Sequence, residues 1–293
     1  MKSTRRTTLF AALLAWPAAV LPLPGDDPSR PAGTPKLRVC ADPNNLPFSN
    51  RAGQGFENRI AELLADELGR ELRYTWWPQR RGFIRKTLRA GDCDLVIGVP
   101  AQFELVDTTG AYYRSSYVFV TRSDAEDPPT SLDDESLRSM RIGVHAIGDD
   151  YANIPPVEAL AQRGVRDQIR GYSIYGDYSQ PDPPRVLIDA VVRGEVDVAI
   201  AWGPLAGYFA QRAEAALSLT PLPARDSLTH MPMQFSIAMG VRRGEADFKR
   251  AIEAAIDARQ ADIQAVLKHY GLPLVEDLAS AASASDADSG DLP

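Results

Sequence analysis

Polar side chains follow four predicted strands, in loops that suit ligand binding. In open parallel sheets, ligands bind outside the carboxyl ends of the strands, so we expect these loops to face one cleft. Trp202 lies just before Gly203-Pro204 and a helix start, which suits an aromatic wall beside backbone N–H donors. Each loop is also rich in turn-forming residues, so a purely structural role stays open. The loops are 42–48, 98–104, 145–151 and 202–207, and their candidate side chains are Asp42, Asn44, Asn45, Phe48, Asp149, Asp150, Tyr151 and Trp202.

The motifs of common catalytic sites are absent from the sequence. It contains no G-x-S-x-G, H-E-x-x-H, G-x-x-x-x-G-K-[ST] or G-x-G-x-x-G, and its three histidines are scattered. Asp149 and Asp150 are paired carboxylates that suit acid–base work, but adjacent acidic residues in a loop are usually solvated. We therefore expect no catalytic residues. The alternative is an enzyme, such as a dehydratase that uses Glu57 or Asp150 as its acid–base group.

Composition excludes further kinds of site. Thirty-two Lys and Arg against 39 Asp and Glu give a net charge of −7, the wrong sign for a nucleic-acid-binding protein. Three His and two Cys are too few for a zinc cluster, a haem-attachment motif or an iron–sulfur site. The sequence therefore predicts no metal, no cofactor and no nucleic-acid partner. The length of 293 residues favours two domains.

The N-terminus has the layout of an export signal. Lys2, Arg5 and Arg6 precede an apolar run of about 15 residues that contains Pro17 and Pro22, too short and proline-rich for a membrane-spanning helix. We predict a cleaved signal peptide over 1–25, a flexible leader over 26–35 and a disordered tail over 276–293. A membrane anchor or a disordered extension is the alternative. No second apolar stretch of about 18 residues follows, so we expect a periplasmic protein without stable membrane insertion.

The two cysteines fit one disulfide bond. Cys40 and Cys93 both fall in predicted strand segments, and an exported protein meets an oxidising compartment. We expect the strands over 37–41 and 94–97 to be neighbours that this bond connects. Two buried free thiols are the alternative.

The order of predicted elements is that of an α/β protein. Apolar periodicity predicts strands over 37–41, 71–77 and 94–97 with helices over 60–69 and 82–88 between them. This alternation implies a parallel sheet with right-handed crossovers. A second series has strands at 140–144, 169–174 and 197–201 and helices at 131–139, 156–162 and 185–193. A loop rich in Pro and polar residues follows 217–222, and a last strand at 234–241 precedes a helical repeat over 248–270.

A faint internal repeat indicates two similar lobes. Residues 88–98 resemble 191–201: each is a helix end, a glycine, an acidic residue and a buried parallel strand. If the strand at 234–241 returns to the first lobe, the chain crosses between lobes twice, which makes a hinge around a ligand. We predict a first lobe of 36–121 plus 232–275, a second of 122–231, and crossings near 120–125 and 220–233.

Five segments carry a family resemblance: 37–50, 55–58, 93–98, 112–120 and 148–151. With them, the chain resembles the quinoprotein dehydrogenase-associated periplasmic binding proteins of the MoxJ/XoxJ type, which are similar to extracellular solute-binding proteins of family 3. The resemblance implies the bilobal type II periplasmic binding protein fold. It also implies association with a pyrroloquinoline-quinone (PQQ)-dependent methanol or alcohol dehydrogenase, as an accessory protein in its maturation or activation.

One departure from the amino-acid receptors of this fold bears on function. Those receptors carry an Arg after the strand that matches 94–98, and it clamps the ligand carboxylate; residues 100–108 contain no Arg here. We therefore predict a non-enzymatic accessory binding protein, with a transporter receptor for a small neutral or cationic solute as the alternative. The predicted contact residues are Asp42, Asn44, Asn45, Phe48, Glu57, Asp149, Asp150, Tyr151 and Trp202.

Overall fold

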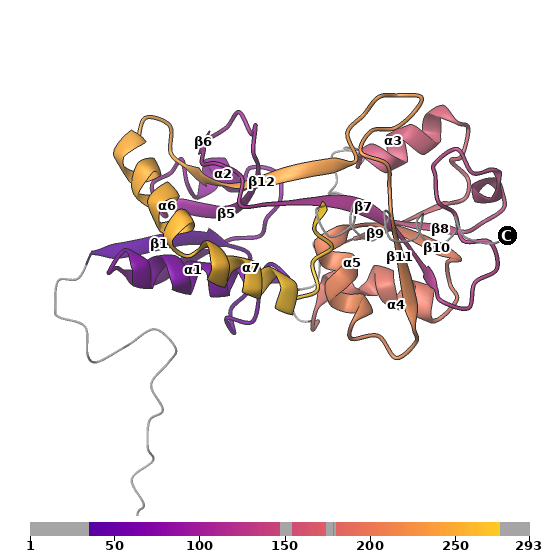
Figure 1. The fold of residues 1–293 in the computed structure, drawn as a ribbon, viewed down its shortest axis with the longest axis horizontal. Helices are drawn as coiled ribbons and strands as arrows, with labels where there is room; N and C mark the ends of the chain where they lie inside the picture. The colour runs from indigo at the N-terminus through magenta and orange to yellow at the C-terminus, as the bar shows by residue number, and fades with distance from the viewer. Residues whose placement is uncertain (1–34, 147–153, 174–177, 179, 276–293) are drawn as a thin grey trace, which may run out of the picture.

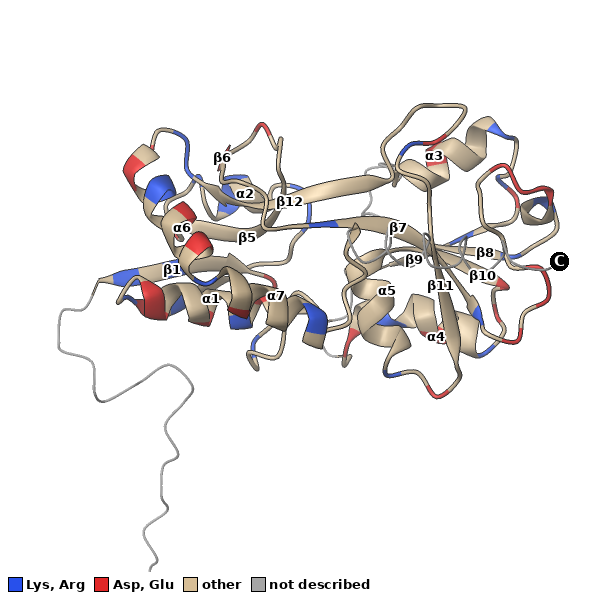
Figure 2. Ribbon diagram, in the orientation of Figure 1, with Lys and Arg blue, Asp and Glu red and all other residues tan. Residues whose placement is uncertain are grey.

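The computed structural model describes residues 35–146, 154–173, 178 and 180–275, which form two lobes side by side (Figure 1). The predicted signal peptide, leader and C-terminal tail lie outside these residues, so they stay predictions. Charged residues gather on the helices and loops around both lobes, while the central strands β5, β10 and β12 carry none (Figure 2). The described chain is thus a mixed α/β protein with apolar strands at the centre of each lobe.

The first lobe is built on a sheet with the strand order β4-β1-β5-β12, in which β1 pairs in parallel with β4 and β5, and β12 is antiparallel to β5. Helices α1 and α7 lie on one face of this sheet, and α2 lies on the other (Figure 1). The bounds of these elements are β1 Lys36–Ala41, α1 Phe56–Glu67, β4 Glu71–Trp76, α2 Phe83–Lys86, β5 Leu95–Pro100, β6 Asp107–Thr108, β12 Gln234–Val241, α6 Ala246–Ala258 and α7 Gln260–His269.

The second lobe repeats this plan with the strand order β7-β10-β8-β9, in which β8 pairs in parallel with both β10 and β9. Strand β11 pairs with the outer part of β7 in antiparallel fashion. The bounds are β7 Tyr113–Arg122, η1 Glu135–Arg138, β8 Ile142–Ala146, α3 Pro155–Gln162, β9 Ile169–Ser173, η2 Pro183–Arg185, α4 Val186–Val192, β10 Val198–Trp202, α5 Gly203–Ala210 and β11 Leu217–Pro221, with a small hairpin of β2 Asn44–Asn45 and β3 Ser49–Asn50 in the first lobe.

Strand β7 joins the lobes. Its residues 113–116 pair with β12, and its residues 117–122 pair with β10 and β11. The chain returns to the first lobe between β11 and β12, so two connections cross between lobes, as the fold class requires. The change of partners in β7 lies slightly before the predicted crossing near 120–125. The lobe boundaries predicted from the sequence stay a proposal.

The C-terminal segment after α7 makes a further connection to the second lobe. The hydroxyl of Ser115 donates to the carbonyl of Pro273 at 2.7 Å, and Ser115 also forms a β-bridge with Leu274. On α5, a Cβ at Gly207 would lie 2.0 Å from the carbonyl oxygen of Gly271, so this close approach requires glycine. The segment therefore packs α5 tightly against the end of α7.

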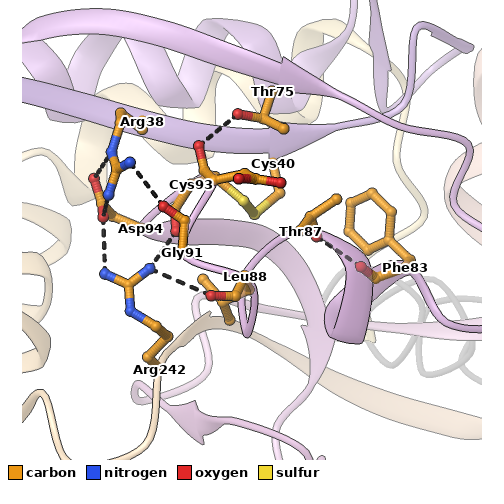
Figure 3. The surroundings of a disulfide bond; sticks show 11 residues. Arg38, Cys40, Thr75, Phe83, Thr87, Leu88, Gly91, Cys93, Asp94 and Arg242 are labelled. Carbon is orange, nitrogen blue, oxygen red and sulfur yellow. Dashed lines mark hydrogen bonds and ion pairs between the residues drawn. A yellow bond between two sulfur atoms is a disulfide. The ribbon is translucent and has the colours of Figure 1, made fainter.

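The cysteines form the expected disulfide (Figure 3). Cys40 on β1 and Cys93 just before β5 have Cα atoms 5.5 Å apart, within the normal range for a disulfide. Strands β1 and β5 are neighbours, with Val39 opposite Leu95. The sulfur atoms lie in an apolar cluster with Phe83, Ile84 and Leu88 of the α2 segment. The bond thus links β1 to the segment before β5, within the apolar cluster against which α2 packs.

The internal repeat corresponds to a repeated ion pair. Arg38 Nε donates to Asp94 at 2.9 Å in the first lobe, and Arg141 Nε donates to Asp197 at 3.1 Å in the second. Each pair spans 56 residues and connects the start of one parallel strand to the start of its neighbour. The lobes therefore share a local structure as well as a sequence pattern.

Two predicted helical segments differ from those observed, and one long observed strand was not predicted. The helix expected over 131–139 is only the short 3₁₀ helix η1, since Asp134 caps it by accepting from the backbone N–H of Ser136 at 3.0 Å. The helical repeat at 248–270 breaks at Arg259 into α6 and α7. Strand β7 was not expected, although it is the longest strand among the described residues. The other predicted strands and helices are observed, with shifted ends.

Candidate functional site

A cavity of about 300 Å³ lies between the two lobes. The first lobe contributes the backbone of β5 at Gly98, Val99 and Pro100, together with side chains of the 42–50 loop, α1 and β12. The second lobe contributes five residues: Tyr117, His145, Ile154, Trp202 and Leu205. This position is the edge at which the carboxyl ends of β5, β8 and β10 meet, where ligands bind in open α/β sheets.

The start of α1 holds Glu57 and Phe48 side by side. The backbone N–H of Glu57 donates to the carbonyl of Phe48 at 2.9 Å, and Asn58 accepts from the N–H groups of Asn50 and Gly55 at 3.0 Å each. A Cβ at Gly55 would lie 2.0 Å from the Phe48 carbonyl oxygen, so only glycine allows the loop to fold onto the helix end. Both the Glu57 and Phe48 side chains thereby line the cavity.

Glu57 is an acid without a cation beside it. Glu57 is 9% exposed, and among the described residues no donor forms a hydrogen bond with its carboxyl group. Burial, together with the charge of nearby Asp42, raises the pKa of Glu57 to about 8. The carboxyl group is therefore mostly protonated near pH 7 while the cavity holds no cation.

Aromatic side chains form one wall of the cavity. Tyr117 from β7, Trp202 from the end of β10 and Phe235 from β12 pack edge to face, with ring centroids 5.4–6.3 Å apart. Such packing stabilises each ring in a fixed orientation. The wall combines both lobes, because Phe235 belongs to the first and Trp202 to the second.

His145, near the end of β8, lines the cavity from the second lobe. It is buried, its ring hydrogen-bonds to the backbone of Pro184, and its Nε2 has no partner among the residues that the structure describes. Burial lowers its pKa to about 4, an effect that the bond to Pro184 only partly opposes. The imidazole is therefore neutral near pH 7, with Nδ1 as the donor and Nε2 as a free acceptor.

Two contacts between the lobes lie beside the cavity. Tyr178 donates its hydroxyl proton to Asp42 at 3.2 Å, and Asn44 donates its side-chain amide to the carbonyl of Gln180 at 2.8 Å. Asp42 is almost fully buried, and it also accepts from the backbone N–H groups of Asn44 and Gln79. Asp42 and Asn44 thus connect the lobes and do not line the cavity itself.

Comparison with known proteins identifies the family. Residues 37–273 match the model of the bacterial extracellular solute-binding proteins, family 3. The chain belongs to this family. It is 34% identical to protein MoxJ of Methylorubrum extorquens, over 83% of this chain and 82% of that protein.

Two solved structures are similar to this chain over much of its length. XoxJ from Methylobacterium extorquens AM1 has a TM-score of 0.67 and 38% identity, over 82% of this chain and 99% of that one. MxaJ from Methlophaga aminisulfidivorans MPT has a TM-score of 0.68 and 25% identity, over 82% and 100%. The chain therefore has the type II periplasmic binding protein fold of this family, and its resemblance to the MoxJ/XoxJ type is confirmed.

The nine predicted contact residues of this family 3 protein fall into three groups by position. Asn45, Phe48, Glu57 and Trp202 line the cavity together. Asp42 and Asn44 lie beside it at the lobe contacts. Asp149, Asp150 and Tyr151 lie outside the described residues. All nine remain candidates for contact with a ligand or partner.

Other cavity residues of this family 3 protein were not proposed from the sequence, among them His145, Tyr117 and Phe235. His145 had a usable signal, because it directly follows an apolar strand. No Lys or Arg is among the described residues that line the cavity, in line with the missing Arg after β5.

Within the described ranges, no helix has the length and apolar character needed to cross a bilayer.

Proposed function

We propose that this protein is a non-enzymatic accessory protein of a PQQ-dependent methanol dehydrogenase. In this proposal it is exported to the periplasm with cleavage of its signal peptide. It aids maturation or activation of the enzyme by binding the polypeptide, or a small ligand needed for it, between its lobes. The observation that carries the proposal is the similarity to MoxJ over more than four-fifths of both chains.

The chemistry of the cavity supports this specialised role. A receptor for α-amino acids needs a cation for the ligand carboxylate, and an Arg supplies it by a bidentate contact. Here the described lining has no Lys or Arg to pair with that carboxylate. The site is therefore a poor match for amino-acid uptake.

Co-purification with a dehydrogenase tests the proposal. The mature chain, immobilised through a C-terminal tag, should retain a purified PQQ-dependent methanol dehydrogenase at low micromolar concentration. Replacing Trp202 with alanine, or Asp149 and Asp150 together, should weaken retention at least tenfold, because truncation of buried aromatic residues at an interface is costly. Trp77→Ala is the matched control, since Trp77 is 39% exposed and lies outside the cavity lining. Full retention by both the Trp202 variant and the Asp149 and Asp150 variant would place the contact surface elsewhere.

A second candidate function is a transporter receptor for a small neutral or cationic solute. The cavity favours it, since about 300 Å³ suits a small molecule better than a polypeptide segment. Absence of a complex with the dehydrogenase, together with a tightly bound small molecule in the protein from its native host, would support the receptor instead.

A further inference from the structure

We propose that the cavity binds a small protonated amine with an apolar body, whose ammonium group pairs with Glu57. The inference rests on the proposed function only in that both place binding between the lobes. It names a ligand class for that site.

Charge selects a cation. Glu57 is the only Asp or Glu, and no Lys or Arg is present, among the described residues that line the cavity. An ionised carboxylate in an apolar site is costly unless a cation compensates it. Asp42 adds a second negative charge close to Glu57. A cationic ligand is therefore stabilised, a neutral ligand gains less, and an anionic ligand finds no counter-charge in the described lining.

Hydrogen bonding selects a cation that carries N–H groups. The Glu57 carboxyl group accepts no hydrogen bond from the described residues, and a buried polar group left unpaired is destabilising. A primary ammonium has three N–H donors. It can therefore both pair with the charge of Glu57 and donate a hydrogen bond to it, whereas a quaternary ammonium can pair with the charge but donates no hydrogen bond.

The aromatic wall selects an apolar body next to the charge. The faces of Trp202 and Tyr117 attract cations, and their area covers an apolar group. A cavity of about 300 Å³ lies at the small end of ligand sites.

Binding should release a proton. The titratable groups that face Glu57 are Asp42, Tyr74, Tyr112 and Tyr113, and the three tyrosines are neutral near pH 7 because burial raises the pKa of each. His145 lines the same cavity and is neutral as well. Since Glu57 is mostly protonated before binding, an arriving ammonium ionises the carboxyl group, and its proton leaves to solvent. The ammonium keeps its own protons.

Calorimetry with three probes of equal size tests the proposal on the full mature chain. Benzylammonium, benzyl alcohol and benzoate share one ring and differ in charge. At pH 7, benzylammonium should bind at least tenfold more tightly than benzyl alcohol, and benzoate should not bind. Titrations in two buffers of different ionisation enthalpy should show release of most of one proton for each benzylammonium bound.

Two variants localise the effect. Glu57→Gln should lose at least tenfold in benzylammonium affinity and should abolish proton release. Glu62→Gln is the matched control on the exposed side of α1, where Glu62 pairs with Arg59, and should change neither. Benzoate or benzyl alcohol binding as tightly as benzylammonium, no binding of any probe at millimolar concentration, or unchanged proton release in Glu57→Gln would each overturn the proposal. Amine binding without retention of the dehydrogenase would overturn only the proposed function. Retention of the dehydrogenase without amine binding would overturn only this inference.

Discussion

The carboxyl group of Glu57 lies directly over the backbone of Gly98. A Cβ at Gly98 would stand 2.2 Å from Glu57 Oε1, well inside van der Waals contact. The start of α1 and strand β5 therefore pack closely here, because the Glu57 side chain occupies the space that a side chain at position 98 would fill. This relationship sets where the only carboxyl group of the described cavity lining can be.

Gly98→Ala should displace the Glu57 carboxyl group from its place on β5. The end of a Glu side chain can rotate away, so the fold should survive with a loss of about 1–2 kcal/mol in the free energy of unfolding. Benzylammonium affinity should fall at least fivefold, as measured by calorimetry. Gly110→Ala is the matched control, because a Cβ there meets nothing within 4 Å and the φ angle is not positive. Equal affinities of the two variants would contradict the position assigned to Glu57.

Glu57 should make the protein less stable as pH rises from about 4.5 to 8. Its pKa is raised from 4.5 to about 8 in the folded state, so the folded protein binds more protons than the unfolded chain across this window. The stabilisation from this group is complete below pH 4.5 and is lost as pH rises through 8. At about 1.4 kcal/mol for each pKa unit, the shift corresponds to at most roughly 5 kcal/mol, so Glu57→Gln should be clearly more stable than wild type at pH 8.5, measured by urea unfolding. No gain would mean that Glu57 is solvated.

His145 should act in the opposite direction at lower pH. Its pKa is lowered from 6.5 to about 4 in the folded state, so the unfolded chain binds more protons between these values. Its contribution to stability is present above pH 6.5 and is lost as pH falls through 4. His145→Gln should therefore flatten the decline in the free energy of unfolding between pH 6.5 and 4. An unchanged decline in this variant would assign the acid sensitivity to other groups.

The sequence predicts the fold better than the site, for identifiable reasons. Strands such as β1, β5 and β10 are short apolar runs between turn residues, and the repeat around Asp94 and Asp197 reveals the two similar lobes. Strand β7 has no such pattern, because its first half packs in one lobe and its second half in the other.

For the site, the strand-end rule brings Phe48 and Trp202 to one cavity, since their positions follow from topology alone. The strand-end rule does not show that Asp42 is held beside the cavity by turn and lobe contacts, whereas Glu57 lines the cavity itself. Nor does it show that His145 has a free Nε2, because that depends on where Pro184 lies. Burial and pairing of polar groups are tertiary properties, and local sequence patterns do not encode them.

The disulfide should contribute substantially to the stability of the first lobe. Cys40 and Cys93 close a loop of about 54 residues, for which the chain-entropy model gives roughly 4 kcal/mol. The double variant with alanine at both positions should lose about this much in urea unfolding. Reduced wild-type protein is the control and should lose a similar amount. A loss below about 1 kcal/mol would show that the bond adds little to the apolar cluster around it.

The repeated ion pairs allow a comparison within one molecule. The Asp94 side chain is 15% exposed and pairs with both Arg38 and Arg242, whereas the Asp197 side chain is 39% exposed and pairs with Arg141. Burial tends to raise the pKa of Asp94, but the two arginines outweigh it and lower the pKa below its ordinary value. This stabilisation is present above pH 4 and is lost as pH falls below that value.

Asp94→Asn should therefore cost about 1–3 kcal/mol at pH 7, because it also leaves the half-buried Arg242 without part of its hydrogen bonding. Asp197→Asn should cost less than about 1 kcal/mol, since exposed ion pairs contribute little. Added salt should reduce the difference between the two losses in unfolding free energy only slightly, because partly buried ion pairs are weakly screened. Equal losses in urea unfolding would mean that the bond pattern shared by the lobes, rather than burial and the second arginine, determines the strength of these pairs.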